Sequence, residues 1–240
     1  MSRSSAQRRG VTLVELVVVI IVMGFLAVGS AEVVRKFFKM IFYLPNQAKV
    51  SQAAGELLES LVEISPTMIT GAPSPWLLGL RFARRRIADL TSPTSIVLAG
   101  ANEIRYATFG TCEPLVSRCV MRLRMVGTTI RRSYRVTAGA TCNLDTFSAE
   151  ETLPYYTAET GIRIDGAAGV PRGLPAGRLF RYFNSADVEL AVPMNCNPAD
   201  ANLANIRRVE IGARVYTGSG NFTLAEGELN VTSSVAIRFP

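Results

Sequence analysis

The sequence predicts an α+β fold in which a long N-terminal helix, first transmembrane and then amphipathic, packs on a C-terminal antiparallel β-sheet. Residues 11–31 are almost continuously apolar, and residues 32–64 repeat apolar side chains every three or four positions, which is typical of a helix. From residue 95 onward apolar and polar side chains alternate, as in half-buried strands. Residues 65–75 contain three prolines and separate the two patterns.

The composition indicates a folded chain without a recognisable catalytic site. Hydrophobic residues make up 48% and charged residues 19% of the 240 residues, enough to build a sizeable core. The absence of histidine excludes Ser-His-Asp and Cys-His catalysis and His-ligated zinc. No P-loop or GxGxxG occurs, and no spacing marks a carboxylate or metal site among the candidate acids Asp145, Glu150, Glu151, Asp187 and Glu189. We therefore expect no enzyme, no cofactor and no bound metal.

Residues 11–31 predict a membrane span. A helix of this length reaches about 30 Å, the thickness of a bilayer's hydrocarbon core. Arg3, Arg8 and Arg9 precede it and place the N-terminus in the cytoplasm. These three arginines account for part of the net charge of +7, so the rest of the chain has only a mild excess of positive charge. That excess is weak evidence for a nucleic-acid partner. Three interpretations fit: an uncleaved anchor, a secretory signal peptide cut after Ala31, or a leader removed before the apolar stretch.

Glu15 separates these interpretations. It is the one charged residue within residues 11–31. A carboxylate inside an apolar membrane helix costs free energy and normally has a charged or polar partner. Neither an anchor nor a signal peptide needs such a group, whereas a helix that associates with a neighbour can use it to select a partner in register.

The segment Arg8-Arg9-Gly10-Val11-Thr12-Leu13-Val14-Glu15-Leu16, followed by a Val/Ile run, resembles the class III signal of type IV pilins and type II secretion pseudopilins. The resemblance implies that residues 1–10 are a leader, cut after Gly10 by a prepilin peptidase that also N-methylates Val11. It makes Glu15 the assembly residue, which would neutralise the new amine of a neighbouring subunit. Two departures, Val11 in place of the usual Phe and Glu32 in place of a frequent proline, leave open whether the helix melts on assembly.

Beyond the span, residues 32–64 predict the outer half of the helix, with Pro45 expected to kink or break it. Residues 76–240 form the predicted globular domain. A second, amphipathic helix is predicted over residues 76–90, with a candidate basic face of Arg81, Arg84, Arg85 and Arg86. That face could bind DNA or lipid phosphate, but a solvated face with one arginine paired to Asp89 is favoured, because no aromatic side chains accompany the arginines.

The strands are predicted from alternation. A hairpin with its turn at Gly127 is predicted for Cys119–Met125 and Thr129–Val136. A second strand pair is predicted for Leu179–Phe183 and Val188–Val192. Three further strands are predicted singly, over Glu103–Phe109, Arg207–Thr217 and Val231–Phe239. Residues 138–178, rich in Gly, Ala, Pro and Thr, predict a long irregular insertion. The C-terminal part contains LFRYFN, then a strand pair, then an alternating final strand that ends in AIRFP. This order is loosely similar to that of the larger minor pilins and J-type pseudopilins.

The four cysteines all lie in the C-terminal part, without a CxxC pair, and an exported domain favours two disulfides. Cys112 and Cys119 flank a short loop and are a natural local pair, which leaves Cys142 with Cys196. The sequence does not choose among the three possible connectivities.

From the resemblance and the size of the domain we expect a minor pilin-like subunit. Its expected partners are the prepilin peptidase/N-methyltransferase, other pilin subunits, an inner-membrane assembly platform and, before assembly, membrane lipid; DNA is possible but unsupported. The expected location is the bacterial inner membrane, then an extracytoplasmic filament at the cell surface. The alternatives are a type II secretion pseudopilin, a DNA-binding competence pilin, and a simple secreted or anchored domain.

Overall fold

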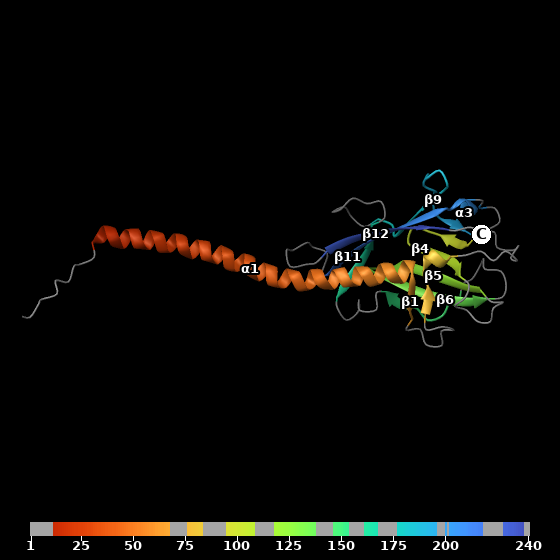
Figure 1. Ribbon diagram of the computed structural model, residues 1–240, viewed down its shortest axis with the longest axis horizontal. Coiled ribbons are helices and arrows are strands. Elements are labelled where there is room, and N and C mark those ends of the chain that lie inside the picture. The colour runs from red at the N-terminus through yellow and green to blue at the C-terminus, as the bar shows by residue number, and fades with distance from the viewer. Residues whose placement is uncertain are drawn as a thin grey trace, which may run out of the picture. The chain divides into compact units, whose positions relative to one another are not determined.

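The structure is a computed structural model, and it describes residues 12–67, 76–83, 95–108, 118–137, 146–153, 161–167, 177–195, 200, 202–217 and 228–237. The chain divides into two compact units, Met1–Pro45 and Asn46–Pro240. The helix followed by antiparallel sheets confirms the predicted α+β class (Figure 1).

Helix α1, Leu13–Val62, contains 50 residues and runs through Pro45 without interruption. Of the predicted kink or break at Pro45, the break is therefore wrong, and the kink stays a prediction. Proline removes one backbone hydrogen bond from a helix, and that loss is local, whereas the turns after it are fixed by packing within the second unit. There, Val50, Ala54, Leu57 and Leu61 are buried, as their spacing of three and four predicts.

A small antiparallel pair follows the helix. Strand β1, Ile64–Pro66, pairs with β2, Trp76–Leu78, and a single 3₁₀ turn, η1, spans Leu80–Phe82. The predicted helix over residues 76–90 is therefore wrong over its described part, residues 76–83. Pairing with β1 holds Trp76–Leu78 extended, and Gly79 permits the close approach to the end of α1, where a Cβ atom would come within 2.3 Å of the Glu63 carbonyl oxygen.

The larger sheet has six antiparallel strands in the order β10-β3-β4-β5-β6-β7. Their bounds are Ile96–Ala99 (β3), Glu103–Thr108 (β4), Arg118–Val126 (β5), Thr129–Thr137 (β6), Glu151–Leu153 (β7) and Met194–Asn195 (β10). The predicted hairpin is confirmed: β5 and β6 pair from Arg118↔Thr137 to Val126↔Thr129. Gly127 lies in its turn at φ +59°, a left-handed conformation that favours glycine.

A second sheet has β11 at its centre. Strand β11, Arg208–Thr217, pairs along one edge with β12, Glu228–Ala236, and along the other with β8, Ile162–Gly166, and β9, Phe180–Phe183. A short helix, α3, spans Asn202–Asn205 just before β11.

Two predictions differ from this second sheet and its neighbours. Strands β7 and β8 lie inside residues 138–178, so that segment is not wholly irregular. Residues Val188–Val192 do not form a strand, and their predicted pairing with Leu179–Phe183 is reduced to a single bridge, Phe183↔Glu189, while β9 pairs with β11.

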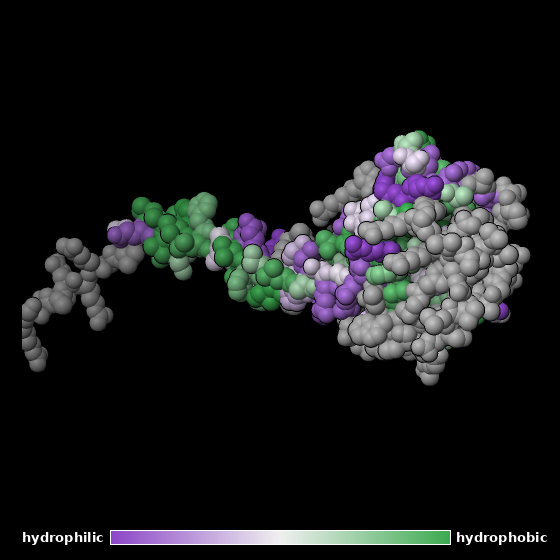
Figure 2. Space-filling model, turned by 45° about the vertical axis from the view of Figure 1, so that its right-hand side comes forward, coloured by the Kyte–Doolittle hydropathy of each residue, from purple (hydrophilic) through white to green (hydrophobic). Residues whose placement is uncertain are grey.

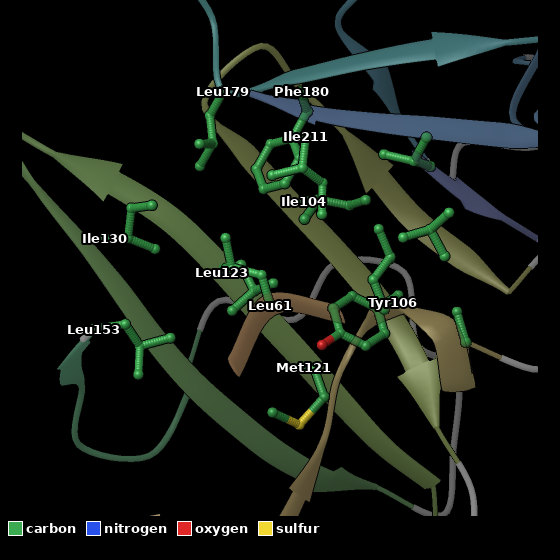
Figure 3. Packing of buried hydrophobic residues seen from close by; sticks show 14 of the residues in the cluster. Leu61, Ile104, Tyr106, Met121, Leu123, Ile130, Leu153, Leu179, Phe180 and Ile211 are labelled. Carbon is green, nitrogen blue, oxygen red and sulfur yellow. The ribbon is translucent and has the colours of Figure 1, made fainter. Parts of the chain in front are cut away.

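The core of the second unit lies between α1 and the sheets. It joins Leu61 of α1 to Ile104, Tyr106, Met121 and Leu123 of the larger sheet and to Phe180 and Ile211 of the smaller one (Figure 3). The hydroxyl of Tyr106 donates to the Leu78 carbonyl at 3.1 Å, and burial raises the pKa of this phenol.

One ion pair is buried with this core. Arg132, which is 1% exposed, donates from Nε to Glu151 and from a terminal nitrogen to the Pro66 carbonyl at 2.6 Å. Thr67 completes the site by donating its hydroxyl to Glu151 Oε2 at 3.0 Å. The segment that leaves α1 is thereby joined to β6 and β7.

Candidate functional site: the N-terminal helix

The first turns of α1 expose an apolar surface on all sides. Leu13 is 80% and Phe25 78% exposed, and the large apolar side chains from Val14 to Leu44 for which a side-chain position is described are exposed as well. Figure 2 shows this segment as a mostly hydrophobic surface. Of the helices the structure describes, α1 is the one long and apolar enough to cross a membrane. Such a surface needs lipid or other helices to cover it.

Glu15 and Thr12 form a reciprocal cap at the start of α1. The backbone N–H of Thr12 donates to Glu15 Oε2 at 2.9 Å, and the Thr12 hydroxyl donates to the same oxygen at 3.0 Å. In return, the Glu15 N–H donates to Thr12 Oγ1 at 3.3 Å. This is the capping box Thr-x-x-Glu, which satisfies N–H groups that the first helical turn leaves unpaired.

The capping box gives the carboxylate of Glu15 polar partners within its own chain. A bare carboxylate in an apolar segment is costly, and these hydrogen bonds lower that cost. They also fix Oε2 toward the N-terminal end of the helix. Sequence reasoning identified Glu15 but not the role of Thr12, although the Thr-x-x-Glu spacing was a signal that could have found it.

The other residues predicted at this end, Gly10 and Val11, lie outside the described residues. So do Arg84, Arg85 and Arg86 of the predicted basic face. Arg81 is described: it is largely exposed and forms an ion pair with Glu63 at 2.5 Å, close to the end of α1. The described part of that face is thus a solvated arginine with an acidic partner.

Of the predicted cysteines, Cys119 alone is described. It is buried on β5 and is part of a disulfide. Cys112, Cys142 and Cys196 lie outside the described residues, so neither predicted pairing is tested.

The acids weighed as catalytic candidates form ion pairs instead. Asp187 pairs with Arg208, Glu189 with Arg178 and Arg181, and Glu151 with Arg132, while Glu150 is shared by three arginines. Asp145 lies outside the described residues. Among the residues that the structure describes, no group of three or more His, Cys, Asp or Glu could hold a metal ion.

Comparison with known proteins assigns the N-terminal segment. Residues 5–31 match the family model of the prokaryotic N-terminal methylation motif. Neither the curated proteins nor the solved structures that were compared gave a match. The match covers Arg8, Arg9, Gly10, Glu15 and the first apolar turns of α1, to residue 31. Over these residues the chain carries the motif that is the hallmark of type IV pilins and pseudopilins.

Proposed function

We propose that this chain is a minor structural subunit of a type IV pilus-type filament, acting in filament initiation, at the tip, or in adhesion or uptake, with no enzymatic activity of its own. The observation that carries the proposal is the methylation motif at residues 5–31, which includes the exposed apolar first turns of α1, where Glu15 is the single acid within residues 11–31. The motif implies processing by a prepilin peptidase and assembly with other pilin subunits.

Cleavage after Gly10 leaves a cationic amine at Val11, four residues before Glu15. Inside an apolar bundle, an ammonium and a carboxylate attract each other strongly and each is costly alone. Glu15 of one subunit then binds the amine of its neighbour, and the bonds from Thr12 hold the carboxylate ready at the same end of the helix. Membrane lipid covers α1 before assembly, and neighbouring helices cover it afterwards.

A minor role is supported by the size of the second unit. Residues 46–240 carry two large sheets and the strand pair β1–β2, which is bulky for a subunit packed densely along a shaft. Ion pairs engage the acids weighed as catalysts, which favours a structural role over an enzymatic one.

Mass spectrometry of the N-terminus of the chain, coexpressed with a prepilin peptidase, tests the processing. We expect N-methyl-Val11 as the first residue. A chain that begins at Glu32 would indicate a secretory signal peptide, and an intact Met1 would indicate an uncleaved anchor. Either result contradicts the proposal.

Glu15→Gln tests assembly. We expect the variant to be processed and to stay in the membrane, but to be lost from sheared filaments because the amine of the neighbour has no counter-charge. Glu32→Gln is the matched control, because it removes an exposed carboxylate from the same helix outside the motif. Equal recovery of the two variants in filaments would contradict the role of Glu15.

The same motif occurs in pseudopilins, so a type II secretion subunit is the second candidate. Deletion of the gene in its host separates the two. Loss of secreted proteins with intact surface filaments supports the pseudopilin, and loss of filaments with intact secretion supports the pilin.

A further inference from the structure

The outer face of the six-stranded sheet, opposite the core, carries arginines on three adjacent strands, and five of them have side chains that the structure describes. We call this set the arginine face: Arg105 on β4, Arg122 and Arg124 on β5, and Arg131 and Arg135 on β6. The register places Arg105 directly opposite Arg122, and Arg124 directly opposite Arg131. Like charges in directly opposed positions destabilise a sheet, so this arrangement needs a reason other than stability.

Among the residues that the structure describes, two carboxylates form ion pairs with the arginine face. Glu150 accepts from Arg122 at 2.5 Å, from Arg124 at 2.7 Å and from Arg131 at 3.2 Å. Glu103 accepts from Arg105 at 2.7 Å. Five guanidinium groups and two carboxylates leave a local excess of positive charge among the described residues.

Two of these arginines keep hydrogen-bonding capacity. Within the described part of the chain, the Nε atoms of Arg124 and Arg131 are buried without a hydrogen-bond partner. Burial and the neighbouring Arg124 lower the pKa of Arg122, whereas the hydrogen bond to Glu150 raises the pKa of Arg124. The side chains of Arg124 and Arg131 nevertheless remain 36% and 42% exposed, so an anion from outside can reach their terminal nitrogens.

The chemistry of the face favours carboxylates over nucleic acid. Glu150 already lies among three guanidinium groups, which shows that a carboxylate fits there. Single-stranded nucleic acid is held by free aromatic rings as well as by cations. The aromatic ring at this face, Phe147, is engaged: the guanidinium of Arg122 lies 4.3 Å and that of Arg105 5.3 Å from its centre.

The spacing of the two exposed arginines also fits an acidic peptide. Arg124 on β5 and Arg131 on β6 are directly opposed and point to the same side of the sheet, which puts their Cβ atoms about 5 Å apart. In an extended peptide, every second side chain faces one side with a repeat of about 6.6 Å. A segment with acids at alternate positions can therefore place one carboxylate at Arg124 and the next at Arg131, because both arginine side chains are long and exposed at their ends.

We propose that the arginine face is a docking surface for an acidic, extended segment of another protein, whose carboxylates bind Arg124 and Arg131. The identity of that protein, a neighbouring subunit of the filament, rests on the proposed function; the binding chemistry does not. Arginine suits this role because its planar fork binds a carboxylate through two hydrogen bonds.

The test uses the full chain in a non-ionic detergent and a fluorescein-labelled peptide of alternating Glu and Ser, with binding followed by fluorescence anisotropy. We expect binding that weakens as salt rises, and no binding of the matching Gln-Ser peptide. Arg124→Gln/Arg131→Gln should weaken binding about fivefold or more, the sum of two exposed ion pairs. The control Arg163→Gln/Arg207→Gln makes the same change in net charge at two exposed arginines elsewhere and should leave binding within about twofold.

A second variant makes the outcome independent of any loss of folding. Glu150→Gln removes the internal carboxylate that competes for the same guanidinium groups, so we expect tighter binding of the acidic peptide. Equal weakening by the two double variants, or no tightening by Glu150→Gln, would overturn the proposal. So would arginine-dependent binding of a duplex oligonucleotide without binding of the peptide. None of these readouts depends on cleavage at Gly10 or on filament formation, so a failure here is distinct from a failure of the proposed function.

Discussion

The two faces of the six-stranded sheet both carry arginine–glutamate ion pairs, but the pair on the inner face is buried and those on the outer face are partly exposed. Glu150 and Glu151 are adjacent in the sequence, but Glu151 pairs with Arg132 in the core, whereas Glu150 pairs with Arg131 and two other arginines on the outer face. Arg132 is 1% exposed as a side chain and Arg131 is 42% exposed. Among the described residues, the inner pair has one cation and one carboxylate, and the outer cluster has more arginines than carboxylates.

The difference in burial indicates a different role for each face: the inner pair stabilises the fold, and the outer arginines are available for binding. A buried charge must be matched, because an unmatched one costs several kcal/mol. The inner pair therefore also uses the Pro66 carbonyl and Thr67, and it binds the segment after α1 to the sheet. An exposed arginine is solvated without a partner and adds little to stability. Such a residue is free to serve binding.

The largest effect is expected when the inner pair is broken. Arg132→Met leaves Glu151 buried without its cation and should lower the free energy of unfolding by about 3–5 kcal/mol. Replacing both partners, Arg132→Met/Glu151→Leu, should recover most of that loss, because no uncompensated charge remains. Urea unfolding of the full chain in detergent measures both. A loss of less than about 1 kcal/mol in the single variant would contradict the buried pair.

A smaller effect is expected at the shared carboxylate. Glu150→Gln removes charge-assisted bonds to three arginines but leaves a group that still accepts hydrogen bonds, at a partly solvated site. We expect a loss of about 1–2 kcal/mol in the same unfolding experiment. A loss as large as that of Arg132→Met would show that the two faces do not differ in the way described.

The comparison also shows which features could be predicted. Helix α1, the β5–β6 hairpin and β11 follow from local periodicity, and Glu15 from a single charge in an apolar run. Strands β7 and β8 could not be found this way, because each has five residues or fewer and is defined by pairing with distant strands. The same holds for the arginine face, which exists only once the register brings β4, β5 and β6 together.

The pH dependence of stability gives a second test of the ion pairs that Glu150 forms on the outer face. Burial raises the pKa of Glu150, but the hydrogen bonds from Arg124 and Arg131 and the charges of the neighbouring arginines together outweigh it and hold the pKa below its ordinary value. A lowered pKa stabilises the fold at pH values above the unfolded pKa of about 4.3, and this contribution is lost as the pH falls through the folded value. The stability difference between the native chain and Glu150→Gln should thus be constant near pH 7 and shrink below about pH 4.3. A difference that does not change between pH 7 and acid would contradict the assignment.

The smallest effect is expected at the exposed end of the outer cluster. Arg131→Gln removes one of three cations around Glu150, and the remaining two, Arg122 and Arg124, still compensate the carboxylate. We expect a change of at most about 0.5 kcal/mol in the free energy of unfolding, and it can be favourable, because Arg131 directly opposes Arg124. Arg163→Gln on β8 is the control for loss of an exposed arginine outside the cluster. If Arg131→Gln leaves stability almost unchanged but weakens binding of the acidic peptide, the two faces have different roles. Arg132 on the inner face then stabilises the fold, and Arg131 on the outer face binds a partner. A loss of more than about 2 kcal/mol would instead make Arg131 a structural residue like Arg132.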